Sequence, residues 1–181
     1  MPPTTLLQQA CRLLSPHRAL QTVPVSWQSL AEGVLEGNRR ALSKAITLVE
    51  SRREVDVKDG RNLLSHLLRM RAPSNTGRTI PTSRRIAVSG PPGVGKSTWL
   101  EAVGMRLVSD GHKVAILAID PSSPVTGGSL LGDRTRMPQL SNHPSCYIRP
   151  SPSGGSMGGV AQRTMEVIHL VEAAGYGYLY I

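Results

Sequence analysis

The residues from Gly90 to Ser97 carry the clearest chemical pattern in this chain. They fit G-x-x-x-x-G-K-[ST], a loop that surrounds the phosphates of a nucleoside triphosphate. Glycines there can take positive φ and turn backbone N–H groups toward an anion. Lys96 supplies a charge for the β- and γ-phosphates, and the Ser97 hydroxyl suits Mg²⁺. We expect these residues to bind the nucleotide: Gly90, Pro91, Pro92, Gly93, Val94, Gly95, Lys96, Ser97 and Thr98.

The segments on either side of this loop must position it. Residues 85–89 form a short apolar run that predicts a buried strand, and residues 98–110 predict a helix that ends at Gly111. Strand, glycine loop and helix is the order in which such a loop binds phosphate, since the helix adds free N–H groups and its positive dipole end. The alternative is a simple glycine-rich turn with an exposed lysine, which would not require a strand before it and a helix after it.

Two carboxylates further along are candidate metal ligands. Asp120 follows a second apolar run, residues 113–119, and therefore lies at the carboxyl edge of a parallel sheet, where ligands bind. Asp133 lies in the glycine- and serine-rich segment that comes next. Either can bind Mg²⁺ directly or through water. Asp-Pro-Ser is equally typical of a turn or helix cap, so the residues alone leave the role of Asp120 open.

Length and composition narrow the function classes. The 181 residues have room for one domain with appendages, and a net charge of +9 raises the question of nucleic acid. The basic residues are scattered, however, and no nucleic-acid motif accompanies them, so we expect no nucleic-acid binding. No apolar run approaches the roughly 20 residues that cross a bilayer, so we expect no membrane span. Cys11 and Cys146 lack metal-ligand spacing, which favours a reducing compartment.

The chain divides into four segments by composition. Residues 1–28 contain Arg12 and Arg18 but no acid, which is typical of a mitochondrial transit peptide, the alternative being an ordinary disordered N-terminus. Residues 29–71 show helical periodicity and predict a helical extension. Residues 72–83 contain Pro73, Gly77 and Pro81 and predict a linker. Residues 84–181 then form the nucleotide-binding part.

Local patterns give the expected elements within these segments. In the extension, a polar turn at residues 55–60 should separate two helices of a hairpin. In the nucleotide part we expect a third strand at 145–149, a helix at 159–174 and a buried strand at 178–181 that leaves an unpaired sheet edge. Alternating strands and helices predict an α/β fold: a doubly wound, mostly parallel sheet of the P-loop NTPase type, incomplete, with an N-terminal helical extension.

Three longer segments point to one family. The segments SGPPGVGKST, AIDPSSPVTGGSLLGDRTRM and YIRPSPSGGSMGGV resemble the MeaB/ArgK family of P-loop GTPases over roughly residues 30–181. The resemblance implies GTP or GDP with Mg²⁺, Ser97, Asp120 and Asp133 at the metal, and Lys96 and Asp133 as catalytic residues in a switch GTPase. It also implies a partner, adenosylcobalamin-dependent methylmalonyl-CoA mutase, homodimers among the full-length members, and the mitochondrial matrix for the mitochondrial branch.

The sequence departs from the family pattern in two respects. Arg134 stands where lysine is common in the family. The acidic Walker B segment and the guanine-reading Asn-Lys-x-Asp motif do not occur among the 181 residues. We therefore expect a truncated form that binds guanine nucleotide weakly and hydrolyses little, and its status as an enzyme is open. A P-loop kinase or ATPase, or a non-catalytic fragment that binds a partner through residues 30–70, are the alternatives.

Overall fold

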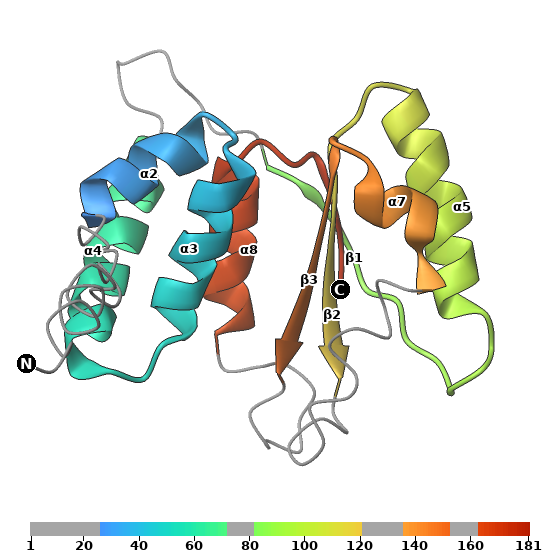
Figure 1. The fold of residues 1–181 in the computed structure, drawn as a ribbon, viewed down its shortest axis with the longest axis horizontal. Coiled ribbons are helices and arrows are strands. Elements are labelled where there is room, and N and C mark those ends of the chain that lie inside the picture. The colour runs from blue at the N-terminus through green and yellow to red at the C-terminus, as the bar shows by residue number, and fades with distance from the viewer. Residues whose placement is uncertain (1–25, 72–81, 121–135, 153–162) are drawn as a thin grey trace, which may run out of the picture.

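The computed structural model describes residues 26–71, 82–120, 136–152 and 163–181. A parallel sheet lies between two layers of helices, with α5 and α7 on one face and α8 with the N-terminal helices on the other (Figure 1). The described elements, in chain order, are α2 (Trp27–Leu35), α3 (Arg39–Glu50), α4 (Glu54–Arg71), β1 (Arg84–Ile86), α5 (Lys96–Ser109), β2 (Val114–Asp120), α7 (Pro138–Asn142), β3 (Cys146–Pro152), α8 (Thr164–Ala173) and β4 (Tyr178–Tyr180).

The four described strands form one parallel sheet in the order β1-β4-β2-β3. Tyr178 pairs with Arg84 on one side and with Val114 on the other, so β4 is an inner strand. The prediction that this last strand leaves an unpaired edge was wrong: within the described sheet the edges are β1 and β3. The error arose because sequence order was taken for spatial order, whereas β4 inserts between β1 and β2.

Each face of the sheet has its own apolar core because strand side chains alternate between faces. In β2, Val114 and Ile116 pack toward α5 and α7. Ala115 and Leu117 pack toward α8 and the N-terminal helices. The second core continues from α2 to β4, so the N-terminal helices and the sheet share one interior. These alternating helical layers confirm the predicted fold class.

Residues 26–71 of the N-terminal layer form three helices where the sequence predicted a hairpin. Gly37 takes φ 75° and Asn38 caps α3, which separates α2 from α3. The predicted turn at residues 55–60 was wrong, because α4 runs through it. Glu54 and Asp56 stabilise the start of α4 as first-turn acids. Gly60 lies in mid-helix where α4 packs on α3, and an added Cβ would make an ordinary contact, 3.5 Å from the Cα of Val49.

The predicted strands and helices around the glycine loop are present with shifted ends. The loop strand is shorter than residues 85–89, and the following helix begins at Lys96 instead of residue 98. Gly175, with φ 84°, follows the end of α8 as its sequence position predicted. Most of the predicted linker lies outside the described residues. No helix in the described ranges is long and apolar enough to cross a bilayer.

Candidate functional site

The glycine loop has the backbone geometry that its motif predicts. Gly93 takes φ 79° and Gly95 takes φ 93°, both in the left-handed region that favours glycine. Gly95 is the N-cap of α5, and no side chain caps the helix there. The first N–H groups of a helix have no acceptor within the helix, so this turn presents donors and the positive dipole end to an anion.

Lys96 lies over the loop instead of extending into solvent. Its Nζ donates to the carbonyl oxygens of Gly90, at 2.6 Å, and Pro91, at 2.9 Å. An ammonium group has three donors, so these two bonds fix its position and leave capacity for an anion. The lysine charge is therefore held beside the N–H groups of the α5 N-terminus.

Both ends of the loop are anchored to the sheet. Beyond β1, Val88 N–H donates to the Ile181 carbonyl at 2.8 Å, and Ile181 N–H donates to the Ile86 carbonyl at 2.9 Å. After the loop, the Trp99 ring meets Tyr180 of β4 edge-on, with 6.1 Å between ring centroids. Trp99 remains 48% exposed. The loop thus extends between one anchor at Ile181, just after β4, and a second at Tyr180 within β4.

The predicted metal ligands are placed unevenly. Ser97 lies in the first turn of α5 and is partly buried, next to the loop lysine. Asp120 is the last residue of β2. Because the strands are parallel, this end of β2 lies at the same sheet edge as the glycine loop. Asp133 lies outside the described residues. Within the described ranges no three His, Cys, Asp or Glu side chains gather into a metal site.

A buried carboxylate that the sequence did not reveal fixes the loop strand. Glu172 of α8 has a fully buried side chain and accepts hydrogen bonds from Ser83 Oγ at 2.8 Å and Arg85 Nε at 2.9 Å. Arg85 also donates from Nη2 to the second carboxylate oxygen at 3.1 Å. This bidentate pair joins β1 to α8 near the start of the loop strand. The sequence does not indicate that this helical glutamate is buried and paired, since its partner Arg85 is far away in the chain.

Two arginines, Arg149 and Arg163, bond the end of α3 to β3 and to the start of α8. Arg149 of β3 contacts Glu50 at 2.5 Å. Arg163, just before α8, donates to the carbonyl oxygens of Val49 and Ser51, the latter at 2.8 Å. Free carbonyls at a helix C-terminus favour a cation, which explains the position of Arg163. The helical layer is therefore bonded to the elements that lead into and out of the carboxyl edge.

The described cysteine takes no part in this site. Burial raises the pKa of the Cys146 thiol to about 12. The charge of Arg39 lowers this pKa by a smaller amount, and the charge of Glu101 raises it further. A thiol with this pKa is protonated at neutral pH and is a poor nucleophile or ligand. Cys11 lies outside the described residues.

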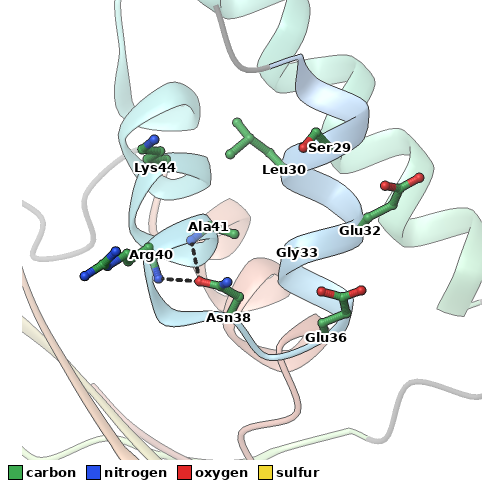
Figure 2. A pocket seen from close by; sticks show the side chains of 9 residues that line it. All are labelled: Ser29, Leu30, Glu32, Gly33, Glu36, Asn38, Arg40, Ala41 and Lys44. Carbon is green, nitrogen blue, oxygen red and sulfur yellow. Dashed lines mark hydrogen bonds between the residues drawn. The ribbon is translucent and has the colours of Figure 1, made fainter. Parts of the chain in front are cut away.

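A separate pocket of about 310 Å³ lies between α2 and α3 (Figure 2). Glu32 of α2 and Glu36 at its C-cap line one side, and Arg40 and Lys44 line it from α3. The helices approach closely at its base, where an added Cβ on Gly33 would lie 2.6 Å from the Cβ of Ala41. This pocket is on the α8 face of the sheet, whereas the glycine loop leads into α5 on the other face.

Comparisons with known proteins agree with this geometry. Residues 42–181 match the family model described as methylmalonyl Co-A mutase-associated GTPase MeaB. The GTPase ArgK of Escherichia coli is 47% identical over 82% of this chain and 43% of its own length. The mouse protein named methylmalonic aciduria type A homolog, mitochondrial, is 44% identical over 84% of this chain and 37% of its own length.

A solved structure shows the same fold. The crystal structure of an LAO/AO transport system kinase has a TM-score of 0.65 at 33% identity, covering 87% of this chain and 42% of that chain. The present chain spans about two fifths of the length of the curated relatives it matches.

Proposed function

Since the chain belongs to the MeaB family of mutase-associated GTPases, we propose that its glycine loop binds GTP and GDP with Mg²⁺. The observation that carries the proposal is the uncapped, glycine-led N-terminus of α5 with Lys96 held across it. Positive φ at Gly93 and Gly95 supports the fit, because a side chain there would strain the backbone that turns N–H groups inward. Guanine as the base is supported by the family.

The proposed residues divide the work of binding phosphate, holding the metal and stabilising charge. The amides from Gly93 to Thr98 bind phosphate oxygens, and Lys96 moves from the loop carbonyls to the β- and γ-phosphates. Ser97 and Asp120 would hold the metal directly or through water, and Asp133 is proposed as a further ligand and switch residue. Mg²⁺, when bound, neutralises charge on the phosphates. Lys96 then stabilises the negative charge that develops as the terminal phosphoryl leaves.

The wider role follows the family. We propose that GTP hydrolysis changes affinity for methylmalonyl-CoA mutase and assists its adenosylcobalamin. The bonds from Arg149 and Arg163 to the end of α3 support a link between the carboxyl edge and the helical layer. The acid-free start of the sequence and the mitochondrial name of the mouse relative support a location in the mitochondrial matrix.

The test is nucleotide titration of the 181-residue chain. Trp99 lies three positions after Lys96, so a Trp27→Phe variant makes its fluorescence a local probe. We expect GTP with Mg²⁺ to change Trp99 emission and to be competed by GDP. Lys96→Ala should weaken GTP binding by roughly 10- to 100-fold, since hydrogen bonds to charged groups contribute about 1.5–3 kcal/mol. Equal GTP affinity in both proteins contradicts the proposal.

Titration with ATP distinguishes the proposed GTPase from the principal alternative. Binding of ATP much tighter than GTP would favour a P-loop kinase or ATPase, a possibility that the printed title of the solved relative also raises. A mutase pull-down addresses the non-catalytic alternative. Capture that ignores both nucleotide and Lys96→Ala would favour a partner-binding fragment.

A further inference from the structure

Glu101 of α5 caps a neighbouring helix. Its Oε1 accepts hydrogen bonds from the backbone N–H groups of Gln139, at 2.9 Å, and Leu140, at 3.4 Å. These groups belong to the first turn of α7, whose own N-cap residue, Met137, contributes no side-chain bond. One carboxylate oxygen of Glu101 therefore does for α7 what an N-cap side chain normally does.

The packing beside this cap holds α7 on α5, and the two helices lie side by side in Figure 1. Leu140 is fully buried and fills the space that Gly104 leaves, because an added Cβ on Gly104 would lie 2.5 Å from Leu140 Cδ2. Gly104 comes three residues after Glu101, so both lie on the side of α5 that faces α7. The cap and the apolar contact together fix the Glu101 side chain in place.

The second carboxylate oxygen of Glu101 has no such bond. Its Oε2 is buried, and in the part of the chain that the structure describes it has no hydrogen-bond partner. A buried carboxylate oxygen without a donor is costly, and native structures leave few of them unpaired. Oε2 can therefore accept a hydrogen bond from a group of the nucleotide site.

Ser97 is the neighbour that can supply the donor. It lies four residues before Glu101, on the same side of α5 and about 6 Å along the helix axis. Side chains at this spacing meet, with about 5–6 Å between their Cβ atoms, and helical side chains lean toward the N-terminus. Glu101 therefore leans toward Ser97. A serine that binds a cation through its oxygen keeps its hydroxyl hydrogen for donation.

On the premise of the proposed magnesium role of Ser97, we propose that Glu101 is a positioning residue that joins the nucleotide site to α7. When the Ser97 oxygen holds Mg²⁺, Glu101 Oε2 accepts the hydroxyl hydrogen of Ser97, while Oε1 continues to cap α7. A hydrogen bond of this kind orients a metal ligand and increases its affinity for the metal. Glu101 thus acts through Ser97 and connects α7 to the phosphate-binding end of α5.

Two substitutions separate the roles of the two oxygens. Glu101→Gln keeps one oxygen for α7 and replaces the other by an NH₂ group, which cannot accept from Ser97. Glu101→Ala removes both oxygens. Asn38→Ala is the matched control, because the Asn38 side chain caps α3 in the same way, with bonds of 2.9 Å to Arg40 N–H and 3.2 Å to Ala41 N–H.

The measurements are GTP affinity in Mg²⁺ and in EDTA, and amide hydrogen exchange at Gln139 and Leu140. We expect both Glu101 variants to lose roughly tenfold or more of GTP affinity in Mg²⁺ and to match the wild type in EDTA. Glu101→Ala should also lose amide protection in α7, whereas Glu101→Gln should keep it. Asn38→Ala should change neither measurement. If Glu101→Ala does not fold, Glu101→Gln carries the test.

The outcomes separate this inference from its premise. Wild-type GTP affinity of Glu101→Gln in Mg²⁺ overturns the proposal, as does an equal loss in Asn38→Ala. A loss of the same size in EDTA would show a purely structural role and overturns it too. A wild-type chain that binds no GTP contradicts the proposed function itself, and this inference with it.

Discussion

The two edges of the parallel sheet present positive charge by different means. At the carboxyl edge, the glycine loop offers backbone N–H groups at the start of α5, with Lys96 bonded across them. At the amino edge, the cations are side chains: Arg84 lies over the Tyr178 ring, and Lys113 Nζ lies beside Gly37 on the other face of the sheet. Backbone donors are fixed and close to the axis of a helix, whereas long side chains adapt to a broader surface. The first arrangement suits a compact phosphate.

The same difference decides which edge can be read from sequence. The carboxyl-edge loop is contiguous, so its residues and its chemistry follow from one motif. The contact of the Tyr178 ring with Arg84 and His112 at the amino edge joins distant segments, since Tyr178 lies more than 60 residues after both. It depends on β4 lying between β1 and β2, which the sequence order conceals.

The largest expected effect comes from breaking the ion pair that joins β1 to α8. Glu172→Ala leaves Arg85 without its buried partner, and such losses cost about 3–5 kcal/mol. Because Arg85 is 33% exposed and can turn toward water, we expect the lower end, about 3 kcal/mol. Urea denaturation measures it. Asp110→Ala, which removes an exposed ion pair with Arg106, should cost at most about 1 kcal/mol and is the control. Equal effects would contradict the structural role of Glu172.

A pair of glycine substitutions sharpens the contrast between the edges. Gly37, with φ 75°, turns the chain beside Lys113, and Gly95, with φ 93°, begins α5. Alanine at either position should cost about 1–2 kcal/mol of stability, since left-handed backbone is unfavourable for it. Only Gly95→Ala should weaken GTP binding, because only Gly95 lies in the loop. Thermal denaturation and GTP titration of both variants check this. Weakened GTP binding in Gly37→Ala would show that the edges are not independent.

The smallest effect concerns the start of α4, away from both edges. Hydrogen bonds from Ser51, first, and from Arg53 lower the pKa of the Asp56 carboxyl. A lowered pKa in the folded state stabilises the fold at neutral pH, and this contribution is lost as pH falls through that pKa. Ser51→Ala should raise the Asp56 pKa toward its ordinary value. NMR titration of the carboxyl carbon measures the shift, and an unchanged pKa would contradict the assigned bond.

Much of the fold was predictable because its signals are local. The loop, the strand at 114–120 and the Gly175 cap follow from short patterns. The predicted turn at 55–60 failed because α4 packs on α3 at Gly60, a contact that no local pattern shows. Glu172 and Arg163 were missed for the same reason, as their partners lie far away in the chain.

The site itself was predictable only in its phosphate-binding half. The roles of Ser97 and Asp120 rest on their positions at the carboxyl edge. Asp133 lies outside the described residues and remains a prediction. Residue types that bind metal are common, so only their approach in space distinguishes a ligand from a cap.

The central claim is that nucleotide binds at the carboxyl edge alone. The most direct test is calorimetric titration of GTP with Mg²⁺ into the wild type, Lys96→Ala and Lys113→Ala, which remove one lysine charge from opposite edges. We predict a roughly 10- to 100-fold loss of GTP affinity for Lys96→Ala and wild-type affinity for Lys113→Ala. Wild-type affinity in Lys96→Ala, or an equal loss in Lys113→Ala, would contradict the account.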